Sequence, residues 1–293
     1  MTKSESQIAE DAHSTRGRGF DFGLRASEFF RHSDFIIRIS AALLCLDALA
    51  TSAQTLGHAK DGSGVRGYSD TPLQPWSGFH VHDADRPAPK RIDPGPFTAS
   101  APAPADAIVL FNGKGLSQWL SNDWRVVDGC VEAVAGNLIT KQSFGDCQIH
   151  LEWMVPTNFT GHMFDRGNNG VLLMGLYEIQ IFDSFSEKLY PDGQAASVYG
   201  QTPPLVNVCR KPGEWQSYDI FFTTPKFAEG KVARPARVTV VHNGVLVQNH
   251  QEIYGETVHR ELPEYKHQVS TGPLALAGHN CPVRLRNIWL RQL

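Results

Sequence analysis

After Asp106 the chain consists of short runs in which apolar and polar residues alternate, separated by turn-forming residues. The clearest run is Cys147–Val155, where every second side chain is apolar and His150 and Glu152 fall on the other face. A period of two residues indicates a β-strand with one face in a core and the other free for solvent or a ligand. No long amphipathic helix separates the runs, so an alternation of strands and helices is excluded.

Turn dipeptides join some of these runs into predicted hairpins. Asp128-Gly129 interrupts residues 124–134 and Asn243-Gly244 interrupts residues 237–248, and such pairs favour the tight turns that connect antiparallel strands. Further strands are expected at 108–111, 138–141, 170–174, 177–183, 216–223, 273–277 and 283–290. We therefore predict an all-β fold for residues 106–293, a single antiparallel sandwich of roughly ten to fourteen strands of the jelly-roll type.

Residues 1–54 are predicted to be a leader. Its apolar stretch at 35–53 ends in small residues and is typical of a signal for export to the periplasm or the extracellular space. The uncharged part, 39–46, is far shorter than the roughly 20 residues of a membrane-spanning helix, so no membrane span is expected. An amphipathic N-terminal helix is the alternative, because acidic residues such as Asp11 and Glu28 precede the stretch.

Residues 55–105 form a Pro-rich segment without apolar periodicity. Prolines cannot donate to a strand ladder, so the segment is predicted to be extended, either as a tether or as an arm laid across the body. Trp76 and Phe79 indicate that this arm is partly docked.

Composition excludes some classes of function. The chain carries 27 basic and 30 acidic side chains, a formal net charge of −3, so nucleic acid is not an expected partner. Its five cysteines show no CxxC spacing and its histidines no HExxH pattern, so no zinc site is signalled. The cysteines are interpreted as small core residues, with a Cys130–Cys147 disulfide as the weaker alternative.

The run Tyr177–Asp183 holds the first candidates for chemistry. Alternation places Glu178 and Gln180 on one face, opposite the isoleucines, and a bulge around Phe182 would bring Asp183 to the same face. The pattern then resembles the E-x-D-x-x-E strand of laminarinase-type glycoside hydrolases, which use two carboxylates roughly 5 Å apart. Here Gln replaces the middle Asp, and a simple polar strand face is an equally weighted alternative.

Three loops carry further candidates. The Gly- and Asn-rich cluster Arg166–Gly170 is either a simple turn or a loop that brings backbone donors to a ligand. Trp215 has polar neighbours, which suits sugar stacking or a core position. His279 suits an acid or base, although a lone His is more often structural. The apolar phase changes near Arg286-Asn287, which predicts a register break.

In series, several motifs resemble the 3-keto-disaccharide hydrolase domain family over about residues 106–293. They are Leu110–Trp119, Gly145–Trp153, Gly167–Gly170, Tyr177–Asp183, Gly213–Trp215 and Arg286–Trp289. The resemblance implies a concanavalin A-like, laminarinase-like jelly-roll sandwich that acts on disaccharides or glycosides oxidised at C3. It also favours export, which is common in this family. The loop Ala277–Val283 departs from the family pattern: it keeps His279 and Pro282 but lacks the family's Asp.

Such a substrate suggests a mechanism. A ketone at C3 acidifies the C2 proton and makes the C1 substituent a β leaving group, so a base can drive elimination, followed by addition of water. The base is expected to be Glu178 or Asp183, and His279 is expected to protonate the leaving group. Substrate contacts are expected from Gln180, Asn168, Asn169, Arg166, Trp215 and Arg286. The substrate is then a small carbohydrate.

The sequence also allows other cofactors and functions. No cofactor is required, but a divalent cation held by Glu178, Asp183 and His279 is not excluded, so the metal is unknown. A non-catalytic carbohydrate-binding module would use the same sandwich without a carboxylate close to a His. An ordinary glycoside hydrolase acting on unoxidised sugar would need two carboxylates on the Tyr177–Asp183 strand.

Overall fold

The structure, a computed structural model, describes residues 54–98, 102–120, 122–157 and 163–293. The predicted export signal at 35–53 lies outside these residues. The described chain consists of strands and irregular segments, with two short 3-10 turns, η1 Met163–Asp165 and η2 Pro191–Gly193. Within the described ranges, no helix has the length and apolar character needed to cross a bilayer.

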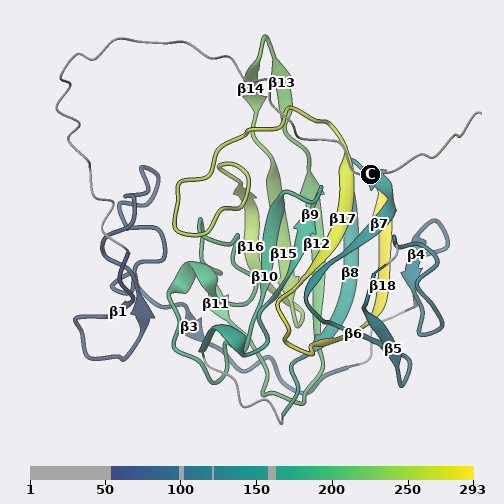
Figure 1. Cartoon of the computed structure of the whole chain (residues 1–293), viewed down its shortest axis with the longest axis horizontal. Helices are drawn as coiled ribbons and strands as arrows, with labels where there is room; N and C mark the ends of the chain where they lie inside the picture. The colour runs from purple at the N-terminus through teal and green to yellow at the C-terminus, as the bar shows by residue number, and fades with distance from the viewer. Residues whose placement is uncertain (1–53, 99–101, 121, 158–162) are drawn as a thin grey trace, which may run out of the picture. The chain divides into compact units, whose positions relative to one another are not determined.

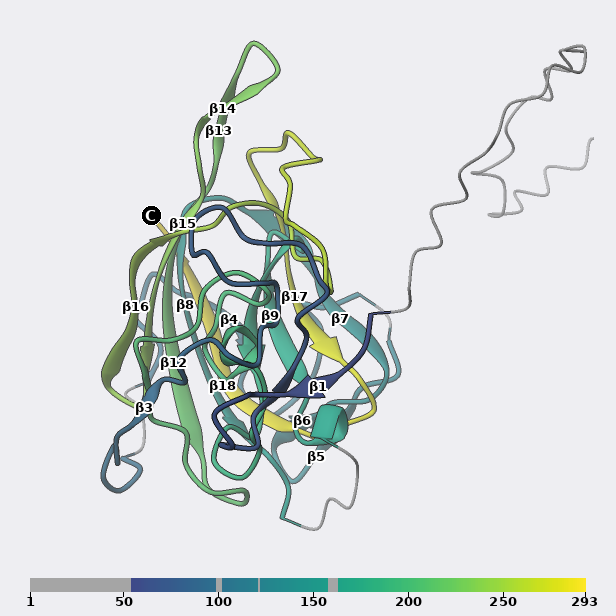
Figure 2. The ribbon, with the colours of Figure 1, turned by 90° about the vertical axis from the view of Figure 1, so that its left-hand side faces the viewer.

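Two antiparallel sheets pack face to face, which confirms the predicted all-β sandwich (Figure 1). The four-stranded sheet has the order β10 (Tyr177–Ile181), β9 (Asn169–Leu173), β17 (Gly272–Gly278) and β7 (Gly136–Phe144). The eight-stranded sheet contains, in order, β16 (Val245–Glu252), β15 (Arg237–His242), β12 (Gln216–Thr223), β8 (Cys147–Met154), β18 (Arg284–Gln292), β6 (Cys130–Glu132) and β5 (Arg125–Val127), with β4 (Ile108–Phe111) pairing β18. Figure 2 shows β16, β12 and β8 in one layer and β9, β17 and β7 in the other.

Short strands lie outside the two large sheets. They are β1 (Gly57–His58) with β2 (Arg66–Gly67), β3 (Lys90–Arg91) with β11 (Val206–Asn207), and β13 (Lys226–Ala228) with β14 (Lys231–Arg234). The β3 and β11 strands pair in parallel, because they join the arm to a distant loop of the body rather than forming a hairpin. The β13 and β14 hairpin was not among the predicted strands.

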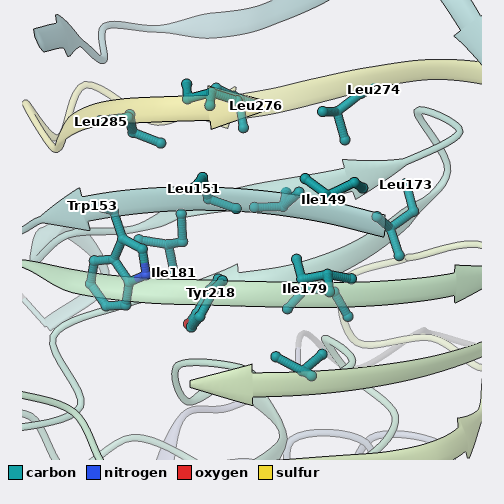
Figure 3. Close-up of a cluster of buried hydrophobic side chains, with 14 of the residues drawn as sticks. Ile149, Leu151, Trp153, Leu173, Ile179, Ile181, Tyr218, Leu274, Leu276 and Leu285 are labelled. Atoms are coloured by element: carbon teal, nitrogen blue, oxygen red, sulfur yellow. The ribbon is translucent and has the colours of Figure 1, made fainter. Parts of the chain in front are cut away.

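The core lies between the two sheets and follows the sequence alternation. Ile149, Leu151 and Trp153 of β8 are at most 1% exposed and meet Ile179 and Ile181 of β10 across the interface (Figure 3). The predicted hairpins are confirmed at β5–β6 and β15–β16. The four cysteines within the described residues are free and buried, so the Cys130–Cys147 disulfide does not form.

The two predicted irregularities have different outcomes. The register of β18 on β8 shifts between Arg286 and Trp289, which confirms the predicted break. The predicted bulge at Phe182 was wrong: β10 pairs regularly with β9 and ends at Ile181. Phe182 and Asp183 are both 1% exposed, because the chain leaves the sheet there and turns into the body.

The Pro-rich arm is extensively docked on the body, and both belong to one compact unit. Trp76 stacks on Tyr254 with ring centroids 4.1 Å apart, and Gln74 Nε2 donates to the carbonyl of Gly200 at 2.8 Å. The Arg66 N–H donates to the carbonyl of Lys188 at 2.9 Å. Residues 54–98 are therefore part of the folded body rather than a free tether.

A core substitution should show how strongly the sheet interface supports the fold. Leu151 is fully buried, so Leu151→Ala is expected to reduce the free energy of unfolding by about 2–5 kcal/mol in urea denaturation, since a cavity replaces a packed side chain. Leu246→Ala is the matched control, because Leu246 is 42% exposed on β16 and should change stability by less than about 0.5 kcal/mol. Equal effects of the two variants would contradict this placement of the core.

Candidate active site

A pocket of about 380 Å³ opens on the outer face of the four-stranded sheet. Its lining residues come from β10 and from five surrounding segments: Tyr68, Phe164, Asn168, Glu178, Gln180, Tyr199, Thr257, His259 and His279. Because Tyr177, Ile179 and Ile181 of β10 point into the core, the alternation turns the side chains of Glu178 and Gln180 outward into this pocket.

The outer edge of β10 is closed by loops rather than by another strand. The Gln180 N–H donates to the carbonyl of Ser197 at 3.1 Å, and the Tyr199 N–H donates to the carbonyl of Glu178 at 3.1 Å. On the same edge, the Glu178 N–H donates to Thr257 Oγ1 at 2.9 Å. These hydrogen bonds satisfy the edge and place Tyr199 and Thr257 beside Glu178.

Glu178 lies at the floor of the pocket and is 9% exposed. Among the described residues, none is placed to form an ion pair with it, and burial raises the pKa of its carboxyl from 4.5 to about 7. The side chain lies over Gly170 of the neighbouring strand, where an added Cβ would meet Glu178 Oε1 at 2.1 Å. The glycine of the Arg166–Gly170 cluster therefore makes room for the carboxyl.

His279 and Asn168 reach the pocket from two loops that are tied together. Asn169 Nδ2 donates to the carbonyl of Cys281 at 3.3 Å, and the Cys281 thiol contacts the carbonyl of Asp165. Asn169 thus lies behind the pocket and holds the His279 loop against the loop that carries Asn168. Burial lowers the pKa of His279, so its imidazole is neutral at neutral pH.

A second histidine, His259, completes the pocket and was missed by the sequence analysis. Its Nδ1 lies 2.9 Å from the hydroxyl of Tyr199, which lies 3.1 Å from the hydroxyl of Tyr190. Partial burial is the main cause that lowers the pKa of His259 to about 4, and the neighbouring His82 and Arg260 contribute to the same shift. No local spacing in the sequence marks His259, because its partner Tyr199 lies 60 residues away.

Asp183, predicted as a catalytic carboxylate, does not reach the pocket. Its Oδ2 accepts from Arg166 Nη2 at 3.2 Å and its Oδ1 accepts from the Ser186 N–H at 3.1 Å. Arg166 also pairs with Glu187 at 2.9 Å. Asp183 and Arg166 therefore brace the turn after β10 rather than contacting a ligand, because the strand ends before Asp183 can share the face of Glu178.

Trp215 and Arg286, predicted to bind substrate, lie elsewhere, against the outer face of the eight-stranded sheet. The Arg286 guanidinium lies 3.8 Å from the centre of the Trp215 ring, and its Nε donates to Glu152 Oε2 at 2.6 Å. Glu152 and Arg286 are direct partners on β8 and β18. Asn287 Nδ2 also donates to Glu152, at 3.1 Å, so the register break serves this ionic cluster.

The cation site left open by the sequence is not assembled. Within the ranges that the structure describes, no group of three or more His, Cys, Asp or Glu side chains is placed to hold a metal ion. Glu178 and His279 share the pocket, but the Asp183 carboxylate that would be the third ligand pairs with Arg166.

The raised pKa of Glu178 has a consequence for stability. The folded chain keeps a proton on Glu178 up to about pH 7, whereas the unfolded chain loses it near 4.5. The stabilising contribution is therefore full below 4.5 and is lost as the pH rises through 7. Glu178→Gln lacks this titration. Its free energy of unfolding, measured by denaturation, should therefore rise relative to that of the wild type by up to about 3 kcal/mol between pH 5 and pH 8. A pH-independent difference would contradict a buried, unpaired carboxyl.

Comparisons with known proteins agree with the fold. The model of a family described as the 3-keto-alpha-glucoside-1,2-lyase-like domain matches residues 106–291. No curated protein matches the chain. A solved structure from Parabacteroides distasonis ATCC 8503, provisionally described as a glycosyl hydrolase, is similar at 45% identity and a TM-score of 0.63, over 66% of this chain and 86% of that chain.

A second structure from the same organism, with the same provisional description, is 20% identical, with a TM-score of 0.48 over 64% of this chain and 94% of that chain. The family match spans all of the sandwich except its last two residues, and it includes Glu178, His259 and His279 of the pocket. This chain therefore belongs to the 3-keto-alpha-glucoside-1,2-lyase-like domain family, and its function is that of a glycoside-directed hydrolase or lyase.

Proposed function

We propose that this chain cleaves the glycosidic bond of 3-keto-disaccharides or 3-keto-glycosides by elimination followed by hydration. The observation that carries the proposal is Glu178, a buried carboxyl with a pKa of about 7 in a pocket whose other lining groups are aromatic, amide, hydroxyl and imidazole. The family description, which names a 1,2-lyase acting on 3-keto-α-glucosides, supports the same chemistry.

The reaction needs a base whose ionised form exists at neutral pH. The Glu178 carboxylate takes the C2 proton, and the C2–H electron pair moves toward the C3 ketone to give an enolate. The enolate re-forms the ketone as the C1–O bond breaks, leaving a C1–C2 double bond. Water then adds its hydroxyl to C1 and a proton to C2, which releases the 3-keto sugar. A carboxyl with a pKa near 7 can take and return this proton.

The leaving oxygen needs a proton, and two neutral histidines line the pocket. We assign Tyr199 as the donor to His259 Nδ1, which leaves the proton of His259 on Nε2. His279, on the rim, is the second candidate donor. The side-chain amides of Asn168 and Gln180 provide donors for the ketone oxygen, where charge develops during elimination.

The carboxylate count in the pocket favours this mechanism over ordinary glycoside hydrolysis. Glu178 is the single Asp or Glu among the residues that line the pocket within the described chain. Retaining and inverting glycosidases use a pair of carboxylates across the scissile bond. A carbohydrate-binding module remains the second candidate, because it would use the same aromatic and amide groups without a titrating base.

Incubation with 3-keto sugars tests the proposal directly. The wild-type chain is expected to release the 3-keto monosaccharide from 3-keto derivatives of trehalose and lactose, and to leave the parent disaccharides intact, as followed by chromatography. Cleavage of the unoxidised sugar alone would contradict the proposal. Binding of both sugars without turnover would favour the carbohydrate-binding module.

The role of Glu178 has its own test. Glu178→Gln is expected to lower kcat by about 10²–10⁴-fold, since the general base is lost. In the wild type, kcat/KM should rise about tenfold per pH unit up to about pH 7 and then level off, because the base must be ionised. Glu229→Gln, on the exposed β13–β14 turn, is the control and should keep full activity. Full activity of Glu178→Gln would remove this residue from the mechanism.

The close approach of Glu178 to Gly170 gives a further prediction. A Cβ at position 170 would collide with the Glu178 carboxyl, which can move because it ends a flexible side chain. Gly170→Ala is therefore expected to fold but to lose about 10²-fold in kcat, as a base displaced by about 1 Å would. Circular dichroism and single-turnover kinetics check the two parts, and an active Gly170→Ala would show that the carboxyl position is not critical.

A further inference from the structure

Among the described residues that line the pocket, one lies outside the family domain. Tyr68 lines the pocket and is 6% exposed, but it belongs to the N-terminal arm, whereas the family match begins at residue 106. The remaining lining residues lie between 164 and 279, inside the match. The arm therefore contributes a wall to a site that the family domain would otherwise leave open on that side.

Close backbone packing fixes the position of Tyr68. Its N–H donates to the carbonyl of His82 at 2.8 Å, within the arm. The preceding Gly67 leaves no room for a side chain, because an added Cβ would meet the His82 carbonyl at 2.4 Å. This contact holds the strand of Tyr68 directly against the segment of His82.

His82 anchors that segment in the body. Its N–H donates to Asp192 Oδ2 at 3.0 Å, and its Nδ1 lies 3.2 Å from Asp192 Oδ1. Both side chains are fully buried, and the His82 ring stacks on Tyr190 with centroids 4.1 Å apart. Burial alone would raise the pKa of Asp192, but His82 and Arg86 bring it below its usual value, so the carboxylate is charged. A buried charged contact of this kind holds the arm in one position.

The Tyr68 ring lies beside His259, one of the two proposed proton donors. It makes an edge contact with His259 at a centroid distance of 6.3 Å, and the Arg260 guanidinium lies 5.4 Å from its centre. With Phe164 and Tyr199 it brings the aromatic side chains of the pocket lining to three. The C–H face of a sugar ring packs well on an aromatic ring, whose face is electron-rich.

We propose that Tyr68 is a substrate-contacting, specificity-determining wall of the pocket, and that the arm is an integral part of the active site. The inference rests on the proposed function for its substrate, an uncharged 3-keto-glycoside. Tyr68 contacts the sugar through its ring, so it contributes to KM more than to kcat.

Kinetics of full-length variants test the contact. Tyr68→Ala is expected to raise KM for the 3-keto-disaccharide about tenfold with kcat changed less than about threefold, whereas Tyr68→Phe keeps the ring and should stay within about twofold of wild type. Trp76→Ala is the matched control, because Trp76 is an aromatic residue of the same arm that packs on Tyr254 away from the pocket. Equal KM increases in Tyr68→Ala and Trp76→Ala, or an unchanged KM in Tyr68→Ala, would overturn the inference.

A labelling measurement separates this inference from the proposed function. Glu178 lines the pocket and is 9% exposed, so its modification by a carbodiimide and glycine ethyl ester, followed by mass spectrometry, should become several-fold faster in Tyr68→Ala and stay unchanged in Trp76→Ala. An unchanged modification rate in Tyr68→Ala would contradict the inference that Tyr68 forms a wall of the pocket, whichever substrate the chain uses. If the wild type cleaves no 3-keto-glycoside, the proposed function fails, and a faster rate still supports Tyr68 as the wall.

Discussion

The site depends on the anchoring of one strand. Ile179 and Ile181 of β10 are fully buried between the two sheets, and the pleat then leaves Glu178 and Gln180 no orientation except the outer face. A slip of one residue would bury the glutamate in the core and expose the isoleucines, at a large cost in free energy. The packing of the core therefore also fixes the position of Glu178, the proposed base.

The environment of Glu178 is low in charge and high in aromatic and amide groups. A carboxyl buried without an ion-pair partner favours its protonated form, which raises its pKa and reduces stability at neutral pH. In ordinary folding this arrangement is unfavourable, yet a base that exchanges a proton near neutral pH requires it. The neutral histidines are consistent with this raised pKa, because a nearby imidazolium would lower the pKa of Glu178.

The two outer faces of the sandwich have different roles. Arg286 and Glu152 form an ion pair on the eight-stranded sheet, and the same guanidinium covers the Trp215 ring. The charged groups of this cluster therefore pair with each other. On the other face, loops and the N-terminal arm surround a floor whose carboxyl is unpaired among the described residues. The arm also carries the buried His82–Asp192 contact, so its docking is specific rather than a consequence of proline content.

The sequence alone determined the strands of the two large sheets, their two hairpins, the break near Arg286 and the outward pair Glu178 and Gln180, because each follows from local alternation or turn chemistry. It could not place Asp183, since whether β10 bulges or ends at Ile181 depends on packing against the body. It also missed His259 and Tyr68. These residues reach Glu178 only through chain segments that are far apart in sequence, and such proximity is decided by how the sheets, loops and arm pack together.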